Sequence, residues 1–246
     1  MGIYALQTAR NGSISVPRKN IAQIRGKPLY RHNIDYINKS VFVEKIFTTT
    51  DIPSIIEEED DSYEVIQGPV ELYGDNAAHI ATIQHGLLEI EKRTGEEVDI
   101  LVIVFGNTLG ARPQDVDAAL SAMIQDETID SCQSVSEYNM FTPIRAMKED
   151  ENGFLTSIID QKVIEEMSSD VDLNHRDAIG NAYFFNGSFW ICRREAIMQN
   201  DGLLPFPWLG RKIKSIRQPT IMEIDAPWQL KWLESGLGFS NWPFVD

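Results

Sequence analysis

The segment Asp99–Phe105, with the sequence DILVIVF, is apolar at every position after its first residue. A strand covered on both faces is apolar throughout, whereas a strand with one wet face alternates apolar and polar residues. This segment therefore predicts a central strand in a sheet with helices on both sides. The runs Ile3–Leu6 and Val43–Thr50 predict two further strands, and the amphipathic pattern over 75–93 predicts a long helix. Such alternation is typical of right-handed βαβ units in a parallel sheet.

The remaining segments are shorter, and they complete an α/β sandwich that we expect to form a single domain over residues 1–246. A lobe at approximately 142–180 breaks the alternation, so we expect it to be an inserted or oligomer-forming piece. The acidic run Glu149–Gly153 has the composition of a hairpin turn. We expect further helices at 28–40, from 113 onward and at 227–235, and further strands at 64–67, 131–135, 143–147, 183–191 and 220–224.

The charge of the chain is unevenly distributed. It contains 22 Lys and Arg against 37 Asp and Glu, a formal net charge of −15 at pH 7, yet its first 31 residues hold six bases and no acid. Binding along a nucleic-acid backbone needs an extended positive face, so we expect no nucleic-acid partner. A small polyanion held at one point is compatible with the basic N-terminal segment.

Several other classes of protein are disfavoured by the sequence. The longest apolar run has six residues, Ile100–Phe105, far short of the roughly 20 that span a membrane. The N-terminal segment MGIYALQTAR lacks the features of a signal peptide. Cys132 and Cys192 lie in apolar or β-rich runs, so we expect small core residues rather than disulfides or a zinc site. A cytoplasmic protein with no membrane partner is the expectation.

Ligands of open α/β sheets bind beyond the carboxyl ends of the strands. Three segments are expected to lie there: Thr8–Asn20, Gly106–Arg112 and Glu223–Asp225. The first reads TARNGSISVPRKN, in which small residues let backbone N–H groups approach phosphates and basic side chains supply charge. Neither GxGxxG nor GxxxxGK[ST] occurs, which excludes two common nucleotide-binding motifs. On composition alone, a solvated basic loop fits equally well.

Ordered sequence blocks narrow these alternatives. They are Arg10-Asn11-Gly12-Ser13, Val16-Pro17-Arg18-Lys19-Asn20-Ile21, Gly26-Lys27-Pro28-Leu29, Thr48-Thr49-Thr50-Asp51, Pro69-Val70-Glu71-Leu72 with Asp75, Phe185-Asn186-Gly187-Ser188-Phe189-Trp190-Ile191, and Glu223-Ile224-Asp225-Ala226-Pro227. In this order and spacing they resemble the acylneuraminate cytidylyltransferase family. That family includes synthetases of CMP-sialic acid and related CMP-sugars, and it is similar to the CMP-Kdo synthetases.

The resemblance implies a Rossmann-like three-layer sandwich of the nucleotide-diphospho-sugar transferase type, with a mostly parallel sheet and a small inserted dimerisation lobe. It implies a nucleotidyltransferase reaction for surface glycan biosynthesis. A hydroxyl of an acidic sugar (a nonulosonic or 3-deoxy-ulosonic acid) attacks the α-phosphorus of CTP, which yields a CMP-sugar and pyrophosphate. Because charge builds on the phosphoryl oxygens, Mg²⁺ and cationic donors are expected to carry most of the catalysis. A homodimer is also implied.

The resemblance assigns the nucleotide to the N-terminal loop. The segment Ala9-Arg10-Asn11-Gly12-Ser13 would hold the triphosphate and ribose, with Asn20 beside the nucleotide. Glu71 and Asp75 would lie near the cytosine. The residues expected to act in catalysis are Arg10, Arg18, Lys19 and Asp225.

Glu223 and Asp225 match the paired acids that bind metal in the family. In a strand, residues i and i+2 point to one side, so both carboxylates could face one ion. The alternative for Asp225 is a capping role at the helix that starts near residue 226. The histidines form no metal-ligand pattern, and His79 is expected to be an ordinary helix residue.

Further residues are implied on the sugar side of the site. Asn186 matches an Asn-Gly pair near the sugar, although a hairpin turn is equally compatible with these two residues. Arg145 matches a basic position that can meet the sugar carboxylate; a surface strand arginine is the alternative, and Arg176 is a second candidate. Thr108 and Arg112 keep the family register after the central strand.

Two positions depart from the family pattern. Ile14 stands where the family carries a lysine for the transition-state phosphate, and Gly106 replaces a glutamine that helps to place the acceptor sugar. Asn107 is the nearest polar replacement for that glutamine. These departures leave two alternatives open: a catalytically impaired nucleotide-binding relative that acts through a partner, or a nucleotidyltransferase with another base or a sugar-phosphate acceptor.

Overall fold

The computed structural model describes residues 1–12, 15–74, 77–168, 170–175, 178, 180–219 and 223–235. The chain divides into two units. The first comprises Met1–Ser134, Asn186–Ile216 and Ile221–Asp246, and the second comprises Val135–Phe185 and Arg217–Thr220. By sequence, the expected lobe at 142–180 falls inside the second unit.

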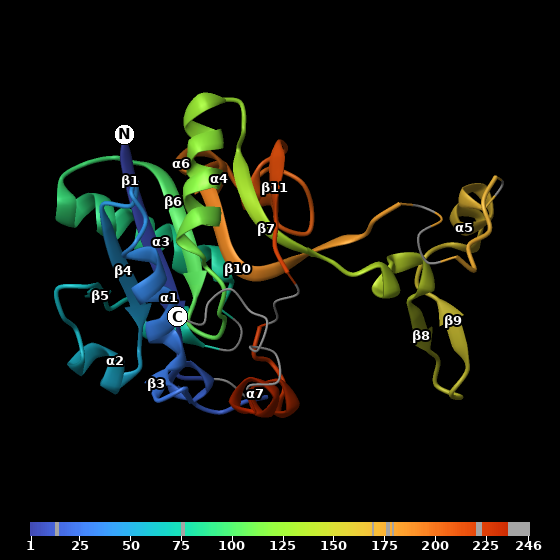
Figure 1. The fold of residues 1–246 in the computed structure, drawn as a ribbon, viewed down its shortest axis with the longest axis horizontal. Helices are drawn as coiled ribbons and strands as arrows, with labels where there is room; N and C mark the ends of the chain where they lie inside the picture. Colours follow the sequence, from blue (N-terminus) through green and yellow to red (C-terminus); the bar gives the residue numbers. More distant parts are fainter. Residues whose placement is uncertain are drawn as a thin grey trace. The chain divides into compact units, whose positions relative to one another are not determined.

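A seven-stranded sheet with the order β11-β7-β10-β6-β1-β4-β5 forms the central layer (Figure 1). Its parallel part consists of β6, β1, β4 and β5, and β10 pairs antiparallel to β6. The central strand β6 carries the DILVIVF run, and all its residues except Asp99 are buried. The strands span β1 Gly2–Ala9, β4 Lys45–Thr50, β5 Glu64–Ile66, β6 Val98–Phe105, β7 Ser131–Glu137, β10 Tyr183–Arg193 and β11 Ile213–Arg217.

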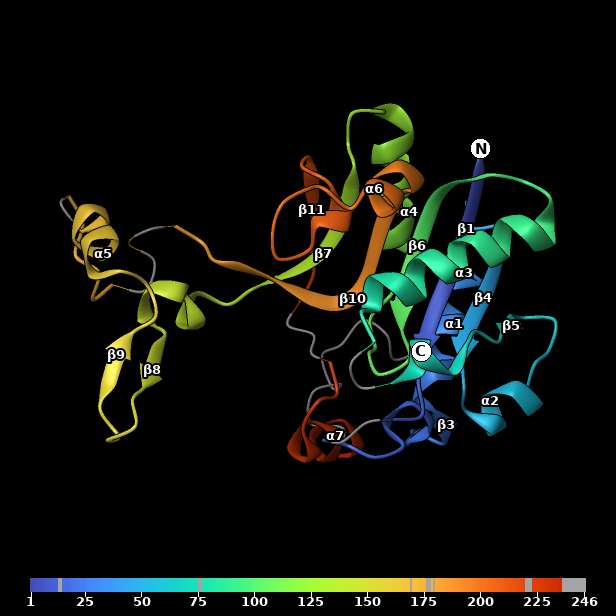
Figure 2. The ribbon, with the colours of Figure 1, turned by 180° about the vertical axis from the view of Figure 1, so that it is seen from behind.

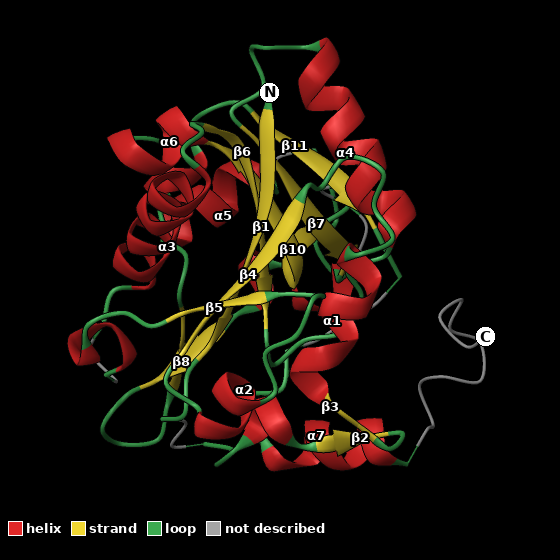
Figure 3. Cartoon of the chain, turned by 90° about the vertical axis from the view of Figure 1, so that its left-hand side faces the viewer, coloured by secondary structure: helices red, strands yellow, loops and turns green. Residues whose placement is uncertain are grey.

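Helices cover both faces of the sheet, as Figure 3 shows. On one face, α1 (Leu29–Ile37) and α4 (Pro113–Gln125) bury apolar side chains against Ile3 and Ala5 of β1. On the other, α3 (His79–Thr94) and α6 (Arg194–Gln199) pack with Tyr4 and Leu6 (Figure 2). Residues of β1 alternate between the two clusters because successive side chains of a strand point to opposite faces. The predicted α/β sandwich is confirmed.

A third apolar cluster lies at the carboxyl end of the parallel strands. It joins α7 (Pro227–Glu234) to the loop after β1 and to a short hairpin of β2 (Gln23–Ile24) and β3 (Lys27–Pro28). Its buried members are Val16, Ile24, Leu29, Leu109, Ile224 and Leu233. The cluster therefore holds the N-terminal loop and the chain before α7 against each other.

The second unit contains a hairpin and a short helix. The strands β8 (Met147–Glu149) and β9 (Leu155–Ser157) pair antiparallel, and Asp150 N–H donates to Phe154 O across the predicted turn. Asp160 caps α5 (Gln161–Met167), since its side chain accepts from Lys162 N–H. The strand expected at 143–147 is wrong, because Pro143–Arg145 form a 3-10 turn (η4) and the strand begins only at Met147.

Further differences from the sequence analysis concern short elements. Of the strand expected at 220–224, residues 220–222 lie outside the described residues and 223–224 are in no strand. The edge strand next to β7 is β11, at 213–217. The short helices α5 and α6 were not expected, and α2 (Pro53–Glu57) ends at the start of the acidic run 57–61. Their few turns carry too weak a periodic signal to separate from loops. Cys132 and Cys192 are free and buried, which confirms their core role. In the described part of the chain, no helix is long and apolar enough to cross a membrane.

Candidate nucleotide site

The loop after β1 is fixed to its neighbours by its first residues. Arg10 donates from Nη1 to the carbonyl of Gly74 at 2.9 Å, which ties the loop to the turn η2 (Val70–Tyr73). The backbone N–H of Asn11 donates to Asp51 Oδ1 at 2.6 Å, at the carboxyl end of β4. Arg10 thus connects two loops at this edge of the sheet. Gly12 is exposed, and the predicted site residue Ser13 and the departure at Ile14 lie outside the described residues.

The second half of the loop is a 3-10 turn, η1 (Lys19–Ile21). Arg18 precedes it with a left-handed backbone, φ 59°, and Lys19 N–H donates to Val16 O at 3.3 Å. Val16 is buried in the third cluster, so this bond attaches the turn to the core of the first unit. Arg18 is exposed. The sequence places two cations beside each other, and the fold holds their backbone in one conformation.

Asn20 lies beside Gly106, the first residue after β6. It is 4% exposed and donates from Nδ2 to Arg10 O at 2.7 Å. A β-carbon at position 106 would lie 2.9 Å from both Asn20 Oδ1 and the β-carbon of Ala9. Real β-carbons do not approach other atoms so closely. In this structure the Asn20 carboxamide occupies the space that a side chain at position 106 would need.

The two predicted metal ligands lie on the segment that leads to α7. Lys19 Nζ contacts Asp225 Oδ1 at 2.6 Å, and Asn107 Nδ2 lies 3.5 Å from the same oxygen. Ile224 N–H donates to Asn107 O at 2.9 Å, which fixes the segment against the loop after β6. The fold thus brings together Lys19, Asn107 and Asp225, which lie far apart in the sequence.

Glu223 packs against Gly187 of β10. A β-carbon at Gly187 would come within 2.2 Å of Glu223 Oε1, and Gly187 has a φ of +73°. Burial raises the pKa of Glu223, the negative charge of Asp225 raises it further, and Lys19 opposes both effects. No group of three His, Cys, Asp or Glu side chains suited to a metal occurs among the described residues. Mg²⁺ takes one or two carboxylates and completes its shell with waters and phosphates, so the two donor types suit it. Residues 223–225 are in no strand, so the expected alternation does not align the two carboxylates, and the magnesium site stays a prediction.

The capping alternative for Asp225 is wrong. The backbone N–H groups of Asp225 and Ala226 donate to Gln229 Oε1, at 2.7 Å and 2.6 Å. The glutamine side chain therefore caps α7, and the Asp225 carboxylate points to Lys19 instead.

The other predicted residues after β6 have structural contacts. Thr108 is fully buried, and Asn33 Nδ2 donates to the carbonyls of Phe105 and Thr108 at 3.0 and 3.1 Å. Arg112 donates from Nε to Asp115 Oδ2 at 2.6 Å in the first turn of α4. These contacts hold the loop, and the predicted sugar contacts of Thr108 and Arg112 stay predictions.

Asn186 is 3% exposed, and its Oδ1 accepts from Ser188 N–H at 3.1 Å. The hairpin-turn alternative is wrong, because Asn186 and Gly187 lie within β10. Glu71 is exposed on η2, and its predicted neighbour Asp75 lies outside the described residues.

Arg145 belongs to the second unit. It donates from Nη2 to the carbonyls of Leu173 and Asn174, at 3.3 and 2.9 Å. The structure places it in the turn η4 rather than on a strand, and Arg176 lies outside the described residues.

His79, expected to be an ordinary helix residue, begins α3 next to the end of β1. As the first residue of α3, it places Nε2 3.3 Å from Oγ1 of Thr8, which lies near the carboxyl end of β1. Its ring packs 5.3 Å from that of Phe105 and 6.2 Å from that of Trp208. Burial of the ring lowers its pKa to about 4, and the charge of Arg10 adds to this effect.

The chain is similar in sequence to known cytidylyltransferases. Residues 5–91, which include the basic loop, match the model of the cytidylyltransferase family. The 3-deoxy-manno-octulosonate cytidylyltransferase of Geobacter metallireducens is 30% identical over 129 residues, 52% of this chain and 47% of that protein. By sequence, about half of the chain is similar, with divergence, to a CMP-Kdo synthetase. The predicted relation to cytidylyltransferases is confirmed, although the match spans about half the length of this curated relative.

Solved structures with the same fold cover nearly the whole chain. A CMP:2-keto-3-deoxy-manno-octonic acid synthetase complexed with CTP superposes with a TM-score of 0.65 at 15% identity, over 97% of this chain and 99% of that one. The 4-diphosphocytidyl-2C-methyl-D-erythritol synthase of Anaerococcus prevotii superposes with a TM-score of 0.61 at 10% sequence identity, over 96% of both chains. A cytidylyltransferase of Leptospira borgpetersenii superposes with a TM-score of 0.57 at 13% sequence identity, over 100% of this chain and 89% of that one. These likenesses confirm the predicted fold class.

Proposed function

We propose that this protein is a cytidylyltransferase that transfers CMP from CTP to an acidic sugar of the nonulosonic or 3-deoxy-ulosonic class, with release of pyrophosphate. The observation that carries the proposal is the contact of Lys19 with Asp225 at 2.6 Å, beside Asn107 and at the carboxyl edge of the parallel strands. A cation and a carboxylate pair at this edge are what a metal–triphosphate complex requires. Activation of a sugar for surface glycan synthesis is the role we propose.

In this proposal the chain's own residues bind and orient the nucleotide. Arg18 and Lys19 are the cationic donors to the triphosphate, because η1 fixes their backbone beside each other. Arg10 holds the 70–74 turn against the loop, so its contribution is to keep the base side of the site in place. Asn20 orients the loop from inside through its bond to Arg10 O.

Glu223 and Asp225 are the residues that would hold Mg²⁺. When bound there, the ion would neutralise charge that develops on the phosphoryl oxygens. Asn107 and Asn186 are our candidates for orienting the sugar acid, since both lie at the same edge as the carboxylate pair. Burial of Asn186 and its bond to Ser188 N–H keep its carboxamide in one orientation.

The proposal is tested by incubating the protein with CTP, Mg²⁺ and a panel of nonulosonic and 3-deoxy-ulosonic acids while pyrophosphate is followed. We expect release with at least one acid and a loss of about a hundredfold in Asp225→Asn, the size of effect seen when one electrostatic group is removed from a site. Asp201→Asn is the matched control, because Asp201 is exposed in the loop after α6. CTP binding without pyrophosphate release from any acid would refute the catalytic claim and leave a non-catalytic relative.

Base preference needs its own measurement. A ligand that binds the folded state stabilises it by mass action, so melting temperatures with CTP, UTP, ATP and GTP rank the four nucleotides. We expect the largest rise with CTP. An equal rise with another nucleotide would contradict cytidine specificity.

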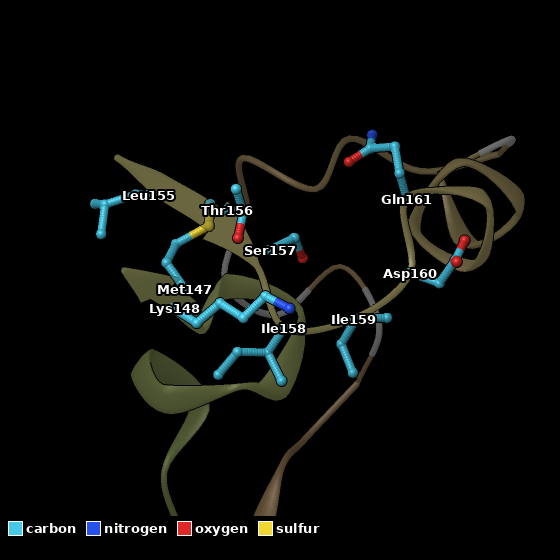
Figure 4. A pocket seen from close by; sticks show the side chains of 9 residues that line it. All are labelled: Met147, Lys148, Leu155, Thr156, Ser157, Ile158, Ile159, Asp160 and Gln161. Atoms are coloured by element: carbon cyan, nitrogen blue, oxygen red, sulfur yellow. The ribbon is translucent and has the colours of Figure 1, made fainter. Parts of the chain in front are cut away.

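We further propose that the protein is a homodimer formed through the second unit. This unit exposes large apolar side chains, among them Phe141, Met147, Phe154, Leu155 and Ile158, each more than half exposed. A pocket of about 700 Å³ lies between the β8–β9 hairpin and the start of α5. Figure 4 shows the side chains that line it, Met147 and Ile158 among them. Exposed apolar side chains that gather on one part of the surface are typical of a protein–protein contact.

A further inference from the structure

The ion pair between Lys19 and Asp225 joins a predicted phosphate-binding cation to a predicted metal ligand. Lys19 Nζ lies 2.6 Å from Asp225 Oδ1. The lysine side chain is 15% exposed and the aspartate side chain 58%, so the lysine is the more buried partner of the pair. Asn107 Nδ2 approaches the same oxygen at 3.5 Å. One oxygen of Asp225 is therefore already engaged by the protein's own cation.

The backbone of Lys19 leaves it few other positions. Its N–H donates to Val16 O and its carbonyl accepts from Ala22 N–H. Val16 in turn is buried in the third apolar cluster together with Ile224, the neighbour of Asp225. One apolar cluster thus holds the backbone near both partners of the ion pair, and the side chains of Lys19 and Asp225 are left to move.

We propose that Lys19 and a divalent cation compete for Asp225, so that the protein binds metal and nucleotide together and metal alone only weakly. A divalent cation between Glu223 and Asp225 would meet the ammonium on Asp225 Oδ1 and would have to displace it, because both are positive. The triphosphate supplies the anionic oxygens to which the displaced ammonium turns. Coupling of this kind is reciprocal: the nucleotide raises affinity for metal by the factor by which metal raises affinity for the nucleotide.

This inference rests on the proposed function for the second half of the exchange, but its first half is measurable without a nucleotide. The probe is Mn²⁺ alone, titrated into the full chain while the electron paramagnetic resonance signal of free Mn²⁺ is followed. Lys19→Met removes the charge and keeps the apolar stem. We expect it to bind Mn²⁺ at least tenfold more tightly than the unaltered protein, and we expect its affinity for CTP in the presence of EDTA to fall at least tenfold.

Lys27→Met is the matched control. Its ammonium pairs with Asp35 of α1, and neither residue touches the carboxylate pair. We expect its Mn²⁺ affinity to be unchanged. Lys19→Gln serves as the second variant should the methionine variant lose its fold, which circular dichroism checks. Adding Asp225→Asn to Lys19→Met should remove the gained affinity.

The outcomes separate this inference from the proposed function. Mn²⁺ affinity that is unchanged or weaker in both Lys19 variants overturns the competition, even in a protein that releases pyrophosphate. A gain in Mn²⁺ affinity supports the competition, even in a protein that releases no pyrophosphate with any acid. A gain that persists after Asp225→Asn also overturns it, since the metal would then bind elsewhere.

Discussion

The carboxamide of Asn20 lies against Gly106, so that a β-carbon at position 106 would approach Asn20 Oδ1 to 2.9 Å. Gly106 N–H also donates to Thr8 O at 2.9 Å, which joins the ends of β1 and β6 at this point. Position 106, inside the proposed nucleotide site, therefore has no room for a side chain in this structure.

Gly106→Ala should therefore disturb both stability and binding. We expect the free energy of unfolding to fall by about 1–3 kcal/mol, the usual cost of overpacking. CTP affinity should fall as well, because Asn20 must move and its bond to Arg10 O weakens. Urea denaturation and calorimetry measure the two effects. Gly74→Ala is the control for stability, since its added carbon makes only an ordinary contact, 3.7 Å from Glu71 O. Higher turnover in Gly106→Gln would contradict this account.

Gly187→Ala should displace Glu223. The added carbon would lie 2.2 Å from Glu223 Oε1, and the backbone φ of +73° is strained for alanine. We expect a loss of roughly 1–3 kcal/mol in the free energy of unfolding. In the background Glu223→Ala the steric part should vanish while the backbone part persists, so the two changes will not add. A double-mutant cycle in urea measures this coupling, and strict additivity would exclude the contact.

His79 should make stability depend on pH. Its pKa is about 4 in the folded protein, below the ordinary value of 6.5. Between these values the unfolded chain binds more protons than the folded one, so stability is complete above pH 6.5 and falls as the pH drops toward 4. His79→Asn should flatten this slope in urea midpoints taken from pH 4.5 to 7.5. The same substitution at the exposed His175 should leave the slope as it was.

The second unit should control the oligomeric state. Phe154→Ser combined with Leu155→Ser removes two apolar side chains that are 69% and 66% exposed. We expect light scattering to show a dimer for the unaltered protein and a monomer for this variant at micromolar concentration. Val41→Ser, at an 80% exposed position of the first unit, should stay dimeric. A monomeric unaltered protein would contradict the proposed dimer.

The sequence by itself determined the layered α/β architecture. The apolar side chains of DILVIVF can all be buried only if helices cover both faces of the strand. The central position of β6 therefore followed from these seven residues. The alternation of strands and helices then placed the loop after β1 at the carboxyl edge, where Lys19 and Asn20 lie. Local patterns of this kind need no knowledge of distant contacts.

Only the tertiary structure decided what the site residues touch. That Lys19 meets Asp225, and that Asn20 fills the space beside Gly106, depends on packing between segments separated by up to 206 residues. The described end of the strand expected at 220–224 shows the same limit: Ile224 is bonded to Asn107 and Asp225 to the Gln229 cap. Such contacts depend on which loops lie together at one edge of the sheet. Local sequence patterns do not encode this, because the loops come from distant parts of the chain.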